Sequence, residues 1–294
     1  MRNYALGLLQ WLRQLYNRLR YAGRGFLLTL RQQPARRLLP IISGVVSISL
    51  FEFVLFRPDL WAIVILLIIA MAVTTGIGLM NTRLTLPGWW HTLITPALLG
   101  ITSVGLLLFL PTATSRQVTI ILVAALFLLF WENIWRYYWD RARYHDEALE
   151  NISLALNTAI IWFFSLFAFN ALLDATIFPG IIASNALLIG SGLVVAIVFF
   201  IDYRTIWVQR YNAETVWLLQ VSQALILGEL FWVTNFLPHS VEVKSFLLVL
   251  AYYLFTNIGR SYLDGTLRSS VLRRYLYLGT FTLLAVFITA NWFV

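Results

Sequence analysis

The sequence contains no cysteine and very little charge. Without cysteine the chain has no disulfides, no thiol nucleophile and no thiolate ligand for a metal. Charged residues make up only 12% of the 294 residues and hydrophobic residues 60%, whereas a soluble domain is roughly 25% charged. So little charge cannot cover a water-facing surface. We therefore expect an integral membrane protein, with no room for a soluble domain of normal size.

Motifs for catalysis and cofactors are also missing. The sequence has no paired-histidine metal signature, no phosphate-cradling glycine loop and no dinucleotide fingerprint. We assign no catalytic residue, no metal ligand and no cofactor.

Apolar segments dominate what is present. Nine of them are long enough, or nearly so, to cross roughly 30 Å of hydrocarbon as helices. They cover residues 39–57, 60–80, 92–110, 117–139, 152–173, 181–201, 215–237, 243–259 and 273–293. The sequence thus predicts an all-α polytopic membrane protein with about nine transmembrane helices.

Basic residues predict the orientation. If the connections alternate between the two sides of the membrane, all 21 basic residues except Arg57, Arg116 and Lys244 fall on one side. Such a bias marks the cytoplasmic side, so we expect a cytoplasmic N-terminus and an external C-terminus in the cell (inner) membrane. Arginines on that rim attract anionic lipid headgroups, which accounts for the net charge of +8 without a nucleic-acid partner.

Residues 1–38 form a separate basic segment. Apolar side chains recur at helical spacing from Tyr4 to Phe26, and arginines lie mainly on the opposite side. The pattern predicts an amphipathic helix in the cytoplasmic membrane interface, with a regulatory or partner-binding helix as the alternative.

One octapeptide occurs twice. NIWRYYWD at Asn133–Asp140 returns as NIGRSYLD at Asn257–Asp264, and similar Phe-Leu-Pro sequences precede the two spans that carry it. The shared order predicts a tandem duplication of a four-helix unit. We expect a first helix at 39–59, one repeat at 60–180 and a second at 181–294, with parallel orientation about an axis along the membrane normal.

Each octapeptide places an asparagine and an arginine on one helical stripe: Asn133 with Arg136, and Asn257 with Arg260. An aspartate follows each arginine at i+4, close enough to pair. Two interpretations stay open. The stripe is a structural lock between helices, or its arginines bind anions along a path between the two repeats.

Two glutamates, Glu132 and Glu229, fall inside predicted spans without an equivalent in the other repeat. A buried charge in the bilayer is costly and is therefore a candidate for function. They are either coupling or substrate residues, or hydrogen-bond acceptors for buried Arg, Trp or Tyr.

Three functions remain open. We favour a transporter of a small molecule or ion, with a pathway between the two repeats. The alternatives are a membrane-embedded enzyme acting on lipid or isoprenoid substrates at the cytoplasmic face, which is less favoured, and a noncatalytic scaffold that assembles as a homo-oligomer or with a partner membrane protein.

Overall fold

The computed structural model describes residues 37–80, 91–139, 146–173, 181–209 and 213–289, and these residues form helices and no strand. The helices are α3 (Leu39–Phe56), α4 (Trp61–Met80), α5 (His91–Phe109), α6 (Ala113–Trp139), α7 (Asp146–Leu173), α8 (Ile181–Gln209), α9 (Ala213–Asn235), α10 (Val241–Leu263) and α11 (Ser269–Thr289), with a short 3-10 turn, η1 (Pro58–Leu60). All nine α-helices of the described chain are long and apolar enough to cross a membrane. The all-α prediction is confirmed, and a helix of suitable length and hydropathy lies at each expected span. The interfacial helix expected within 1–38 lies almost entirely outside the described residues.

Several helices extend beyond the predicted spans. α7 begins at Asp146 rather than 152, and α8 continues to Gln209 rather than ending at 201. Hydropathy marks where side chains leave the hydrocarbon, but the backbone hydrogen bonds of a helix continue past that point. As a result Asp202 and Arg204, which the sequence placed in a connection, lie on a helix.

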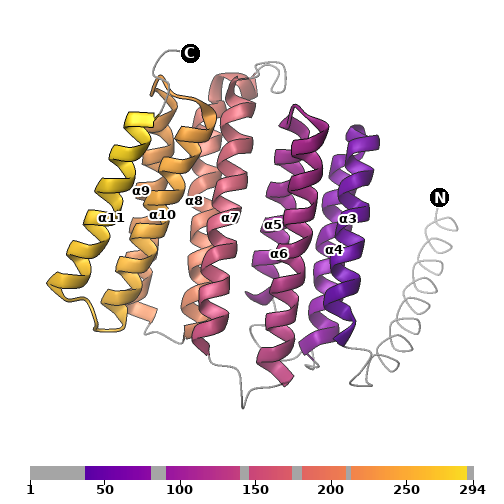
Figure 1. Ribbon diagram of the computed structural model, residues 1–294, viewed down its shortest axis with the longest axis horizontal. Coiled ribbons are helices and arrows are strands. Elements are labelled where there is room, and N and C mark those ends of the chain that lie inside the picture. The colour runs from indigo at the N-terminus through magenta and orange to yellow at the C-terminus, as the bar shows by residue number, and fades with distance from the viewer. Residues whose placement is uncertain (1–36, 81–90, 140–145, 174–180, 210–212, 290–294) are drawn as a thin grey trace, which may run out of the picture.

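The helices run alternately up and down and form an elongated bundle (Figure 1). α3 and α4 lie at one edge and α11 at the other, and α7 lies between the two groups of helices. α4, α6, α8 and α10 end at the lower end of the bundle in Figure 1, where α5, α7, α9 and α11 begin. We call this the lower end. The helix ends that the sequence assigned to one side of the membrane therefore do meet at one end of the bundle.

α7 is the centre of the packing, because it contacts α5, α6, α8 and α10. About three-fifths of the apolar span is buried in both α5 and α7 (61%), against 6% in α11. α11 packs mainly on α10, where Leu254 lies against Gly279. The outer surface of α11 is therefore left to lipid or to another protein.

The predicted duplication remains untested. Asn133 and Asn257 do share a local geometry, since each side-chain amide donates to the carbonyl four residues earlier, Leu129 at 2.6 Å and Tyr253 at 2.7 Å. The surrounding packing differs, because α5 packs closely along α7 whereas α11 packs mainly on α10 rather than on α9. The repeat boundaries at 60–180 and 181–294 stay predictions.

Two glycines test the packing of α8 on α9. A β-carbon at Gly228 would lie 2.5 Å from Cγ2 of Val195, whereas one at Gly192 would meet nothing within 4 Å. We expect Gly228→Leu to destabilise the protein by about 1–3 kcal/mol through overpacking and Gly192→Leu to leave stability unchanged or improved. Thermal unfolding of the purified variants in detergent measures both, and equal stability of the two would contradict this packing.

Candidate functional site

Arg204 is the most deeply buried charge in the described chain, at 1% exposure. Its Nη1 donates to the Thr95 hydroxyl of α5 at 2.6 Å, and its Nη2 donates to the Ser153 hydroxyl of α7 at 3.1 Å. The guanidinium carbon lies 5.4 Å from the ring centre of Phe130 on α6, within cation–π range. One side chain of α8 therefore binds three helices of the preceding group.

Asp202 and Tyr252 extend this polar contact on the side of α10. Asp202 is buried at 7% exposure and interacts with the guanidinium of Arg260. The fully buried Tyr252 hydroxyl faces Asp202, Asn157 and Thr256, but no described residue lies in hydrogen-bonding geometry with it. α7, α8 and α10 thus converge on one hydroxyl group.

Gln223 of α9 also belongs to this group of polar side chains. Its amide nitrogen donates to the Thr256 hydroxyl at 2.8 Å, and both side chains are buried. We call the whole assembly the polar cluster. It comprises Thr95, Ser153, Asn157, Asp202, Arg204, Gln223, Tyr252, Thr256 and Arg260.

The polar cluster lies inside the bundle near its lower end. At a rise of 1.5 Å per residue, Asn157 and Tyr252 are each about 16 Å along their helices from that end. The cluster therefore begins near the helix ends and reaches well into the apolar span, at the boundary between α5–α7 and α8–α10.

Many polar atoms of the cluster are buried without a partner among the described residues. They are Nε and Nη2 of Arg260, Nε of Arg204, Oδ2 of Asp202, the hydroxyl of Tyr252, and both amide atoms of Asn157. Buried polar groups are normally satisfied by protein or by ordered water. This density of unsatisfied groups indicates that water or a polar ligand belongs in the cluster.

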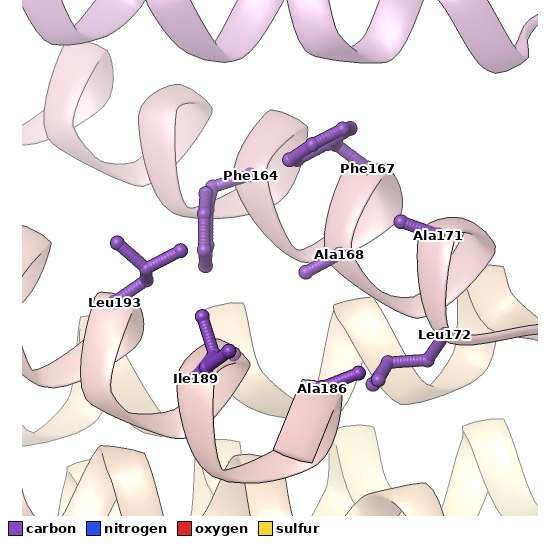
Figure 2. Close-up of a pocket in the computed structure, with 9 residues that line it drawn as sticks. Phe164, Phe167, Ala168, Ala171, Leu172, Ala186, Ile189 and Leu193 are labelled. Atoms are coloured by element: carbon purple, nitrogen blue, oxygen red, sulfur yellow. The ribbon is translucent and has the colours of Figure 1, made fainter. Parts of the chain in front are cut away.

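Above the polar cluster, the same helices meet through apolar side chains. Phe169 of α7 stacks on Phe231 of α9 with ring centres 4.5 Å apart. Between α7 and α8 a pocket of about 40 Å³ is lined by phenylalanine, alanine, glycine, leucine and isoleucine side chains, among them Phe164, Ala168 and Ile189 (Figure 2). A pocket of this size and polarity suits no polar solute, so the apolar layer closes the upper side of the cluster.

The structure separates the two arginines of the octapeptides. Arg136 lies on the surface, 54% exposed, and its Nε donates to Glu132 at 3.0 Å, whereas Arg260 turns into the polar cluster. The residue four positions before each arginine differs as well. Glu132 captures Arg136 on the surface of α6, but α10 has Thr256 at the corresponding position, which has no charge with which to hold Arg260.

Glu132 pairs with Arg136 on its own helix, which is the geometry of a structural ion pair. The pair predicted between Arg136 and Asp140 falls partly outside the described residues. Asn133 is buried and Asn257 half-buried, and each bonds to its own helix. Of the six candidate residues named from the sequence, Arg260 alone enters the polar cluster.

Glu229 lies far from the cluster, in the upper part of α9. Its side chain is exposed and borders an open groove of about 570 Å³ between α8 and α9, together with Ser191, Gly192, Gly228 and Trp232. A carboxylate facing outward at this depth is unusual, because ionisable residues in membrane spans generally face the protein interior.

Most of the polar cluster was missed by the sequence analysis. Arg204 was counted among the basic residues of a connection, and Asp202 was overlooked as a carboxylate within a span. Three signals pointed to the site: the Asp-x-Arg pair at the end of an apolar span, Gln220 and Gln223 within the next span, and the i,i+4 pair Ser153 and Asn157.

The nine apolar helices of the described residues, with polar groups buried between them, fit the class of multi-pass membrane proteins. The chain matches no protein-family model, and no curated protein or solved structure is significantly similar to it.

The hydroxyl partners of Arg204 provide a test of the site. Thr95→Val leaves a donor of a buried cation unsatisfied, and we expect a loss of about 1–3 kcal/mol in unfolding free energy. Thr282→Val is the control, because Thr282 is half-buried and its hydroxyl donates to Leu278 of its own helix rather than to another helix. Unfolding in mixed detergent micelles measures both, and equal stabilities would show that Arg204 does not hold α5 to α8.

Proposed function

We propose that this protein is a transporter that moves a small polar solute or ion between the helices α5–α7 and α8–α10. The observation that carries the proposal is the polar cluster, whose unsatisfied polar atoms come from both groups of helices and lie at their boundary. Polar groups in membrane spans mark substrate and ion pathways.

The arrangement around the cluster supports a gated pathway. Polar side chains of the cluster extend toward the lower end. On the upper side, Phe169, Phe231 and the apolar residues that line the pocket close the cluster. Transport then requires the two groups of helices to separate on the upper side and close on the lower side. The excess of arginine in the connections at the lower end supports placing that end in the cytoplasm.

Cysteine accessibility tests the pathway, because the natural sequence offers no competing thiol. Asn157 and Leu156 are neighbours on α7 and are equally buried, at 1% exposure. In reconstituted vesicles we expect Asn157→Cys to react with a membrane-impermeant thiol reagent added to either side. The reason is that a transporter opens its pathway to one side of the membrane and then to the other. Leu156→Cys should react from neither.

A reaction of Asn157→Cys from one side only would identify a dead-end cavity, and no reaction would identify a sealed structural core. Either result contradicts transport through the polar cluster. Circular dichroism of each variant confirms that the helices are intact.

Glu229 favours a second candidate function, self-assembly in the membrane. A helix of a second copy lying in the groove between α8 and α9 would place a hydrogen-bond donor on this carboxylate, and interhelical hydrogen bonds of this kind associate membrane helices. The exposed surface of α11 gives further area for such contacts.

Energy transfer between copies labelled at Ser269→Cys tests self-assembly in lipid. We expect Glu229→Leu to abolish the energy transfer, because it removes the carboxylate. Ser222→Leu changes an exposed position of the same helix and should preserve the transfer. Transfer that is absent in the parent protein, or unchanged by Glu229→Leu, would exclude assembly through this groove.

A further inference from the structure

We infer that the solute held by the polar cluster is a small monovalent anion. This inference rests on the proposed function and names its substrate class. It rests on two features of the cluster, an excess of positive charge and an excess of unsatisfied hydrogen-bond donors. Both favour a negatively charged hydrogen-bond acceptor as the ligand.

The charges do not balance. Arg204 and Arg260 bring two guanidinium groups, which remain protonated in proteins, whereas Asp202 is the only carboxylate of the cluster. An excess positive charge inside a bilayer-spanning bundle is costly unless a counterion accompanies it. With Asp202 ionised, one bound monovalent anion makes the cluster neutral.

The cluster also has more unsatisfied hydrogen-bond donors than unsatisfied acceptors. The Tyr252 hydroxyl and the Asp202 carboxylate face each other and can satisfy each other. The remaining unsatisfied donors are two guanidinium nitrogens of Arg260, one of Arg204 and the Asn157 amide nitrogen, and the remaining unsatisfied acceptor is Asn157 Oδ1. A water molecule brings as many donors as acceptors and leaves the surplus in place. An anion brings acceptors alone and removes it.

The geometry limits the size of the anion. Asn157, Arg204 and Tyr252 are at most 1% exposed, and the phenylalanines above the cluster close that side. An anion enclosed here is comparable to chloride or formate. A phospholipid phosphate also binds guanidinium groups, but its acyl chains would have to thread between α7, α8 and α10.

The two octapeptides provide a matched pair of variants. Arg260→Gln removes a cation of the cluster, whereas Arg136→Gln removes the equivalent arginine from the surface of α6, where Glu132 holds it. Equilibrium dialysis of the purified protein in detergent, with radioactive chloride at constant ionic strength set by gluconate, gives affinity and stoichiometry. Unlabelled formate and a soluble short-chain phosphatidate serve as competitors.

We expect one chloride per chain, displaced by formate and not by phosphatidate. Arg260→Gln should weaken binding at least about tenfold, since a hydrogen bond to a charged group is lost, and Arg136→Gln should leave it unchanged. In case Arg260→Gln fails to fold, Asn157→Asp provides a second variant. Its carboxylate supplies the negative charge from within the cluster, so the variant should fold and bind no chloride.

Three outcomes overturn the inference: no saturable binding in the parent protein, equal loss in Arg260→Gln and Arg136→Gln, or displacement by phosphatidate. The last would assign the site to a lipid headgroup. If chloride binds but Asn157→Cys reacts from one side only, the anion is a structural ligand. The transport proposal then fails and the anion inference stands. Two-sided reaction without chloride binding would contradict the anion and leave transport standing.

Discussion

The contact of Arg204 with Thr95 and Ser153 is the interaction on which the middle of the bundle depends. In lipid the hydrophobic effect does not drive helices together, so interhelical hydrogen bonds act beside van der Waals packing in selecting neighbours. A guanidinium from α8 that bonds to hydroxyls on α5 and α7 fixes both the choice of neighbours and their relative depth. That register also sets the depth of Asp202, two residues before Arg204 on the same helix.

Hydroxyl groups carry no charge and are therefore weak partners for the buried guanidinium of Arg204. They satisfy hydrogen bonds of Arg204 without neutralising it, so the positive charge of the guanidinium remains in the apolar bundle. Asp202, the only carboxylate of the cluster, interacts with the guanidinium of Arg260. A site with one carboxylate for two guanidinium groups is held in place structurally yet remains electrostatically incomplete, which is the condition that a reversible ligand requires.

Sequence reasoning predicted the spans because hydropathy alone determines which segments can be solvated by lipid, and each expected span contains a helix. The polar cluster depends on something that hydropathy does not report, namely the direction in which a side chain near a helix end points. Arg136 and Arg260 stand in nearly the same octapeptide, yet one lies at the surface and the other inside. The rotation of each helix against its neighbours decides this, and it results from long-range packing. Arg204 and Asp202 were missed for the same reason.

The difference between Glu132 and Thr256 bears directly on whether the polar cluster is only structural. In α6 the glutamate four residues before the arginine forms an ion pair and completes the charge balance locally. A glutamate in place of Thr256 would provide the missing negative charge in α10 and would make the cluster a closed, neutral lock. Instead the chain carries a threonine there, which accepts a hydrogen bond from Gln223 and adds no charge. Arg260 therefore shares the one carboxylate of the cluster, Asp202, with no glutamate on its own helix turn to complete the charge balance, and a bound anion would complete it.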